Sequence, residues 1–114
     1  MNLVKIQAEL KAPKNQTNNF GKYKYRSAED ILTAVKPLLK EYKVILTLED
    51  EVIVIADWHF IKATVILQCV ENGQTVSNVA YAREPLNKKG MDESQISGTA
   101  SSYARKYALN GLFL

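Results

Sequence analysis

The sequence predicts one α+β domain in which an antiparallel meander of about four strands packs against helices. Three observations support this prediction. Apolar residues recur at helical spacing towards both ends of the chain, they alternate with polar residues through its middle, and 114 residues suit a single domain. The composition, 46% hydrophobic and 24% charged, is typical of a soluble globular protein and favours neither disorder nor a membrane protein. The longest apolar run, residues 52–56, is far shorter than the roughly 20 residues that span a bilayer.

The N-terminal third predicts two helices joined by an extended segment. Residues 2–11 form a short amphipathic helix that stops near Pro13, and residues 12–26 form a loop or an extended arm. Ser27 then begins the sequence Ser-Ala-Glu-Asp, which is typical of a capping box at a helix start. The helix covers residues 27–42, and Pro37 inside it should produce a kink.

The middle of the chain predicts four strands. A first strand over 44–48 is followed by an acidic turn at 49–51, and a second, central strand covers 52–56. After a turn at Asp57-Trp58, the third and fourth strands cover residues 59–70 and 75–83. Asn72-Gly73 is a strong signal for a two-residue hairpin turn, because both residues tolerate positive φ.

The C-terminal part predicts a basic loop over 84–91 and a helix from Asp92 to about Asn110, stopped by Gly111. The expected buried stripe of this helix consists of Ile96, Ala100, Tyr103 and Tyr107. The chain ends on Leu-Phe-Leu without a polar tail, so we expect it to be the core of a longer protein.

Lysine and arginine are concentrated towards the two ends of the chain. Residues 1–43 hold nine basic against four acidic residues, residues 44–79 one against five, and residues 80–114 five against three. Clustered positive potential attracts phosphate backbones, so this distribution suggests a surface for a polyanion; solubility alone is the alternative. The chain has no secretory signal and a single cysteine, which together predict a reducing, cytoplasmic location.

The segment Phe20-Gly-Lys-Tyr-Lys-Tyr-Arg26 alternates cations with aromatic rings, and no acid interrupts it. Single-stranded nucleic acid offers phosphates to such cations and unstacked bases to such rings. An edge strand with buried tyrosines and solvated lysines is the alternative. The candidate binding residues of this arm are Lys22, Tyr23, Lys24, Tyr25 and Arg26.

The predicted hairpin carries a second candidate site. With Asn72-Gly73 as its loop, Lys62 faces Arg83 and Thr64 faces Tyr81. Two cations across a ladder repel one another unless an anion lies between them. Lys62, Tyr81 and Arg83 therefore form a candidate phosphate-contact patch on the outer face of the sheet. A neutralising carboxylate, such as that of Glu84 or Asp57, is the structural alternative.

Basic residues around the last predicted helix form a third candidate. Lys88 and Lys89 precede this helix, and Arg105 and Lys106 lie within it, so that together they can complete a basic cleft. Basic residues late in a helix also oppose its dipole without any further function, which is the alternative for Arg105 and Lys106.

The sequence contains few candidate catalytic residues. His59 is the only histidine, and no Gly-x-x-x-x-Gly-Lys-Ser/Thr motif is present. Asp30 with Glu41-Tyr42-Lys43 imitates a nuclease trio, but these two acids lie about 16 Å apart along one helix at 1.5 Å per residue. We therefore expect a protein that is not an enzyme and that uses no cofactor or metal. A metal-dependent nuclease and a protein-interaction module are the alternatives.

Several ordered blocks resemble the essential recombination function (ERF) family of phage single-strand annealing proteins. The first is Lys14-Asn15 followed by Tyr23-Lys-Tyr-Arg-Ser-Ala-Glu-Asp-Ile-Leu32. Later blocks are Ala80-Tyr-Ala-Arg-Glu84, Gly90-Met-Asp-Glu-Ser-Gln95 and the run Gly98-Thr-Ala-Ser-Ser-Tyr-Ala-Arg-Lys-Tyr-Ala-Leu109. Thr99 and Lys106 stand where the family pattern has Ser and Arg; both changes keep the hydroxyl or the charge.

The resemblance implies an ATP-independent protein that coats single-stranded DNA and anneals complementary strands in phage recombination. It also implies a fold related to the Rad52-like annealing proteins, assembly into rings or helical filaments, and action in the host cytoplasm. Residues 1–114 are then a DNA-annealing core that lacks a further C-terminal region, which would contact single-strand-binding protein. The positions that match the family pattern as DNA-binding or groove-forming residues are Tyr23 to Arg26, Arg83 and Tyr103 to Lys106.

Overall fold

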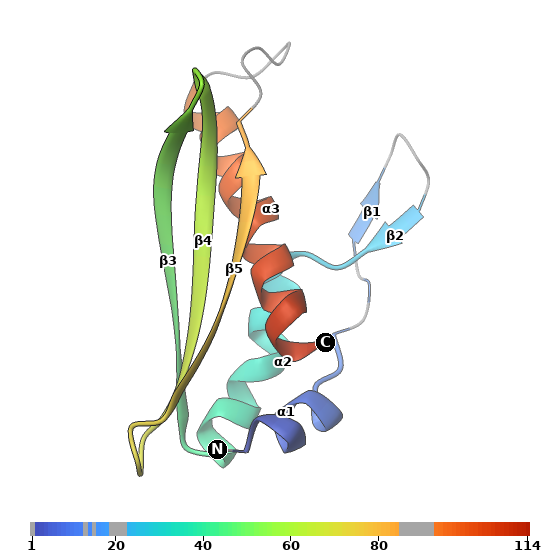
Figure 1. Ribbon diagram of the computed structural model, residues 1–114. Helices are drawn as coiled ribbons and strands as arrows, with labels where there is room; N and C mark the ends of the chain where they lie inside the picture. The colour runs from blue at the N-terminus through green and yellow to red at the C-terminus, as the bar shows by residue number, and fades with distance from the viewer. Residues whose placement is uncertain (1, 13, 15, 19–22, 85–92) are drawn as a thin grey trace.

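The computed structural model describes residues 2–12, 14, 16–18, 23–84 and 93–114. An antiparallel sheet of three strands, in the order β3-β4-β5, lies along helix α3, and α1 and α2 pack near the C-terminal end of that helix (Figure 1). A separate two-stranded ribbon, β1-β2, stands beside them. The elements are α1 Leu3–Glu9, β1 Gln16–Asn18, β2 Tyr23–Tyr25, α2 Ala28–Glu41, β3 Val44–Ile55, β4 Trp58–Cys69, β5 Thr75–Arg83 and α3 Glu93–Phe113. The predicted α+β architecture is confirmed.

Helix α2 begins where the sequence predicts, because its first turn satisfies its own backbone donors. The Asp30 amide donates to Ser27 Oγ at 3.2 Å, and the Ser27 amide donates to Asp30 Oδ2 at 2.8 Å, which completes a capping box. Ile31 and Val35 form the fully buried side of the helix. Asp30 therefore has a structural role at the helix start.

The predicted turn at residues 49–51 is wrong, because β3 runs without interruption from Val44 to Ile55. The segments predicted as two strands are one edge strand, so the sheet has three strands in the described chain where about four were expected. The acidic triplet fits within a strand because alternate side chains point to opposite faces of the sheet. The hairpin turn lies at Ala56-Asp57, where both residues have positive φ, 48° and 66°, as in a type I′ turn.

The β4-β5 hairpin differs from the predicted register by two residues. Lys62 pairs with Tyr81, and Arg83 pairs with Phe60. The loop is longer than the Asn72-Gly73 signal predicts, because it closes between the Cys69 amide and the Gln74 carbonyl oxygen, 2.8 Å apart. A shift of two residues preserves the side-chain alternation, so Lys62, Tyr81 and Arg83 lie on the outer face as predicted.

The predicted buried stripe of α3 is wrong in its tyrosines. Tyr103 and Tyr107 are 51% and 56% exposed, and the buried positions that face the sheet are Ala100, Ala104 and Ala108. These short side chains let the helix lie close to β4, whose buried residues are Ile61, Ala63, Val65 and Leu67. The core therefore sits between α3 and one face of the sheet, and α2 closes it at one end.

Gly111 does not stop α3, which continues to Phe113. A Cβ atom at this position would lie 2.2 Å from Asn78 Nδ2 of β5, and that amide donates to the carbonyl oxygen of Ala108 at 2.9 Å. The glycine therefore leaves room for the Asn78 side chain between helix and sheet, and it does not mark the helix end. Within the described chain, no helix is both long and apolar enough to cross a membrane.

Candidate nucleic-acid interface

The outer face of the sheet, which points away from α3, carries cations and aromatic rings. Because Ile61 and Ala63 of β4 are buried against the helix side, their neighbours along the strand face the other way. We call the resulting group the sheet patch; it consists of Trp58 and Lys62 from β4 and Tyr81 and Arg83 from β5. The Trp58 and Tyr81 side chains are 39% and 56% exposed, so both rings are accessible to a ligand.

Trp58 and Arg83 are held together at one end of the sheet patch. The Arg83 Cζ atom lies 4.2 Å from the centroid of the Trp58 ring, a cation–π contact that contributes about 0.5–1 kcal/mol at an exposed site. The ring of Trp58 thus contacts Arg83, a partner that the sequence analysis does not include beside the carboxylates of Glu84 and Asp57. A cation–π contact leaves the guanidinium charge in place, so Arg83 can still receive an anion.

Lys62 lies at the centre of the sheet patch. Its cross-strand neighbours are Tyr81 on β5 and Glu51 on β3. No ion pair joins Lys62 to Glu51 or to any other residue of the described ranges. The predicted repulsion between Lys62 and Arg83 is relieved by the two-residue shift, since the two cations are not directly opposite each other.

The exposed tyrosines of α3 lie elsewhere. Successive residues are about 100° apart around a helix, so Tyr103 and Tyr107 flank the alanine stripe on one side and Arg105 flanks it on the other. Arg105 reaches β3, whereas Gly111 meets Asn78 of β5, which places the two tyrosines on the β5 side of the helix. The Lys106 Nζ atom lies 5.9 Å from the Tyr107 ring centroid.

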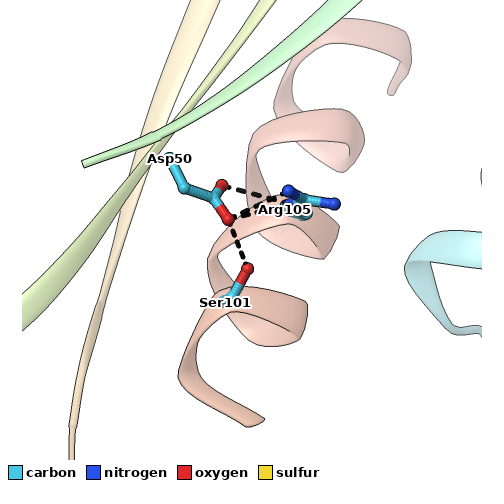
Figure 2. A network of polar contacts seen from close by, with 3 residues as sticks. All are labelled: Asp50, Ser101 and Arg105. Atoms are coloured by element: carbon cyan, nitrogen blue, oxygen red, sulfur yellow. Dashed lines mark hydrogen bonds and ion pairs between the residues drawn. The ribbon is translucent and has the colours of Figure 1, made fainter. Parts of the chain in front are cut away.

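Arg105 is already paired with a carboxylate. Its Nε and Nη2 atoms donate to Asp50 of β3 at 3.0–3.2 Å, and Ser101 Oγ, one turn earlier on α3, donates to Asp50 Oδ2 (Figure 2). Partial burial opposes ionisation of Asp50, but the hydrogen bonds from Arg105 and Ser101 outweigh it and hold the pKa of this carboxyl below its ordinary value of 3.8. The predicted contribution of Arg105 to an open basic cleft is therefore not seen: its charge is neutralised within the chain.

The predicted arm adopts an extended conformation, in which β2 pairs with β1. Arg26 follows β2, is half-buried and lines a small cavity together with Ile31 and Phe113. The predicted binding residues Lys22, Lys88 and Lys89 lie outside the described residues, as do the side chains of Tyr23, Lys24 and Tyr25.

The sequence predicts one surface shared by arm, hairpin and last helix, and the described residues do not form it in a single chain. The sheet patch faces away from α3, whereas Tyr103, Arg105 and Lys106 belong to the helix on the other side of the sheet. Sequence reasoning missed Trp58, which it placed in a turn, and the partnership of Asp50 with Arg105. No group of three metal-ligating side chains converges within the described ranges.

The fold and the sheet patch define a small α+β module that carries two cations and two solvent-accessible aromatic rings on the outer face of its sheet. The model of the ERF superfamily matches residues 1–114, and the chain belongs to that superfamily. It is also 57% identical over 111 residues to the essential recombination function protein of Salmonella phage P22. The match covers 97% of this chain and 52% of the phage P22 protein, so the chain spans about half the length of that relative. No solved structure matches the chain significantly.

Proposed function

We propose that the chain serves phage recombination by binding single-stranded DNA and annealing complementary strands without ATP. Membership of the ERF superfamily and the name of the phage P22 relative support a recombination role. The sheet patch is the observation that carries the DNA-binding part, because it presents two cations and two accessible rings on a face of the sheet that no helix of the described chain covers. The proposed place of action is the cytoplasm of the host bacterium.

The chemistry of the sheet patch suits an unpaired polynucleotide. Lys62 and Arg83 contact backbone phosphates, and Trp58 and Tyr81 offer stacking surfaces that every base can use, each worth about 1–3 kcal/mol. Phosphate contacts leave the Watson–Crick edges of the bases open, so a second strand can test its pairing. Base pairing drives annealing, and the cations reduce repulsion between the two backbones.

Self-association belongs to the same proposal. Both outer strands of the sheet, β3 and β5, have an edge without a partner strand in the described chain, and unpaired edges are templates for pairing with another chain. We propose a homo-oligomeric ring or filament, which would let sheet patches and α3 surfaces of successive copies line one DNA path. A contact with single-strand-binding protein through a further C-terminal region is a separate part of the proposal.

Trp58 provides a direct test, because it is the only tryptophan. Titration with oligothymidylate should quench its fluorescence, and affinity should fall with salt by a log–log slope of about −0.7 for each phosphate contact. Arg83→Gln should weaken binding of all sequences alike and reduce the slope by one contact. Lys36→Gln, which removes an exposed lysine from α2, is the matched control and should bind as the wild type does. Salt-independent affinity, or equal losses in both variants, contradicts the proposed site.

Annealing is measured with two complementary labelled strands whose fluorescence is quenched on pairing, without nucleotide. Acceleration by the wild-type chain supports the function, and a mass measurement of the same sample gives the oligomeric state. Cleavage of labelled DNA that requires Mg²⁺ would instead indicate a nuclease. A chain that retains no DNA at low salt would indicate a protein-interaction module.

A further inference from the structure

The carboxylate of Asp50 contacts two polar side chains of α3. Two guanidinium donors of Arg105 and the hydroxyl of Ser101 converge on its carboxylate, and Oδ2 accepts from both residues. Arg105 and Ser101 are four residues apart, so both side chains lie on one side of α3. The donors therefore come from one rigid element and the anion from another, the edge strand β3.

A phosphate group is chemically suited to the same donors. A guanidinium binds carboxylates and phosphates through the same pair of parallel N–H donors, and a serine hydroxyl is a common phosphate ligand. The pair is reachable from solvent, since the side chains of Arg105 and Asp50 are 38% and 28% exposed. Such partly exposed ion pairs are individually weak, so an incoming anion can displace the carboxylate.

Asp50 belongs to the same chain as Arg105 and Ser101, and this determines which external anions can displace its carboxylate. An intramolecular group acts at an effective concentration in the millimolar range or above, so dilute single anions compete poorly with it. A polynucleotide bound at other points of the protein presents its phosphates at a comparable local concentration. The site would therefore open to a strand and stay closed to small anions.

We propose that Asp50 is an internal competitor that closes an anion site of Arg105 and Ser101 until the phosphate of a bound strand displaces it. The inference rests on the proposed DNA binding, and adds a subsite on α3 together with the residue that regulates it. Arg105 then contributes to affinity only after its ion pair with Asp50 opens.

Asp50→Asn tests this directly, because asparagine keeps the shape and a hydrogen-bond acceptor but removes the charge. We expect oligothymidylate affinity at low salt to rise by up to about 5-fold, which is the release of an ion pair worth up to about 1 kcal/mol. The gain should be absent when Asp50→Asn is combined with Arg105→Gln. Circular dichroism and thermal unfolding confirm that each variant is folded, and Asp50→Ser replaces Asp50→Asn if the latter is not.

The matched control is Glu71→Gln. It makes the same change in net charge and also releases a cation, since Glu71 lies 3.6 Å from Lys43 in a separate, exposed ion pair that includes no residue of α3. A gain confined to the Asp50 variants supports the proposal. An equal gain in Glu71→Gln, or a folded Asp50 variant with unchanged or weaker affinity, overturns the proposal. The ion pair between Asp50 and Arg105 would then only stabilise the packing of β3 against α3. If wild type and all variants fail to bind DNA, the proposed function fails as well.

Discussion

Replacing Gly111 by alanine should destabilise the fold, although alanine is the better helix former. The added Cβ atom would lie 2.2 Å from Asn78 Nδ2, so the amide must rotate away and lose its hydrogen bond to the Ala108 carbonyl. Leaving that part-buried pair unsatisfied costs about 1–3 kcal/mol. The gain in helix propensity offsets up to about 1 kcal/mol. With this offset, we expect a net loss in the free energy of unfolding of up to about 2 kcal/mol.

The double variant separates these two effects. In Asn78→Ala the amide is gone, so adding Gly111→Ala should stabilise the chain by up to about 1 kcal/mol, the reverse of its effect in the wild type. Urea unfolding followed by circular dichroism at several protein concentrations measures all four corners of the cycle, and 1 kcal/mol corresponds to roughly 4 °C in Tm. If Gly111→Ala alone raises the stability, the close approach of α3 to β5 is not as described.

Three further outcomes follow from local features. Changing Ala56-Asp57 to Asn-Gly should raise the free energy of unfolding by about 1–2 kcal/mol in urea unfolding, because both residues have positive φ in a type I′ turn; an unchanged value would argue against that conformation. The hydrogen bond that Tyr42 donates to Glu9 raises the pKa of the Tyr42 hydroxyl to about 12. The stability that this hydrogen bond gives the fold is therefore complete below pH 10 and lost as pH rises through 12. In an alkaline unfolding series, Tyr42→Phe should reduce this loss of stability. Ser27→Ala should lower Tm through the loss of about 1 kcal/mol of capping energy, and glycine there should restore most of it.

Local chemistry made part of the fold predictable. The start of α2 follows from Ser27 and Asp30, which are three residues apart and satisfy each other's backbone amides. The alternation along β4 follows from its sequence alone, which is why the outer-face position of Lys62, Tyr81 and Arg83 was predicted correctly even with the wrong partners. Alternation determines the face of a side chain, whereas register also depends on the loop.

The errors arose where a residue's partner is far away in sequence. The acidic triplet resembles a turn until Arg105, 55 residues later, supplies a counter-charge for Asp50. Gly111 resembles a helix stop until Asn78 is placed beside it. The stripe containing Tyr103 is apolar enough to be core, but the positions of α3 that face the sheet are Ala100, Ala104 and Ala108. How closely the helix approaches the sheet is a property of the assembled fold, so the helix sequence alone does not determine it.

The candidate site shows the same division. The sequence contains the cations and rings, and their residue types are sufficient to suggest an unpaired polynucleotide. The contact of Trp58 with Arg83 depends on two strands whose contacting residues are 25 positions apart, and no local pattern predicts it. The sequence likewise does not predict that Asp50 neutralises Arg105, because net charge does not reveal which charges are paired.

Strand β4 carries the only tryptophan of the chain at its first residue and the only cysteine at its last, Trp58 and Cys69. Eleven residue steps of about 3.3 Å separate them by roughly 36 Å when the strand is extended. The native indole and a dye attached to the half-buried thiol thus form a donor–acceptor pair for energy transfer, and no label site has to be engineered. Energy transfer between the two would show whether the strand keeps its length while copies of the protein assemble.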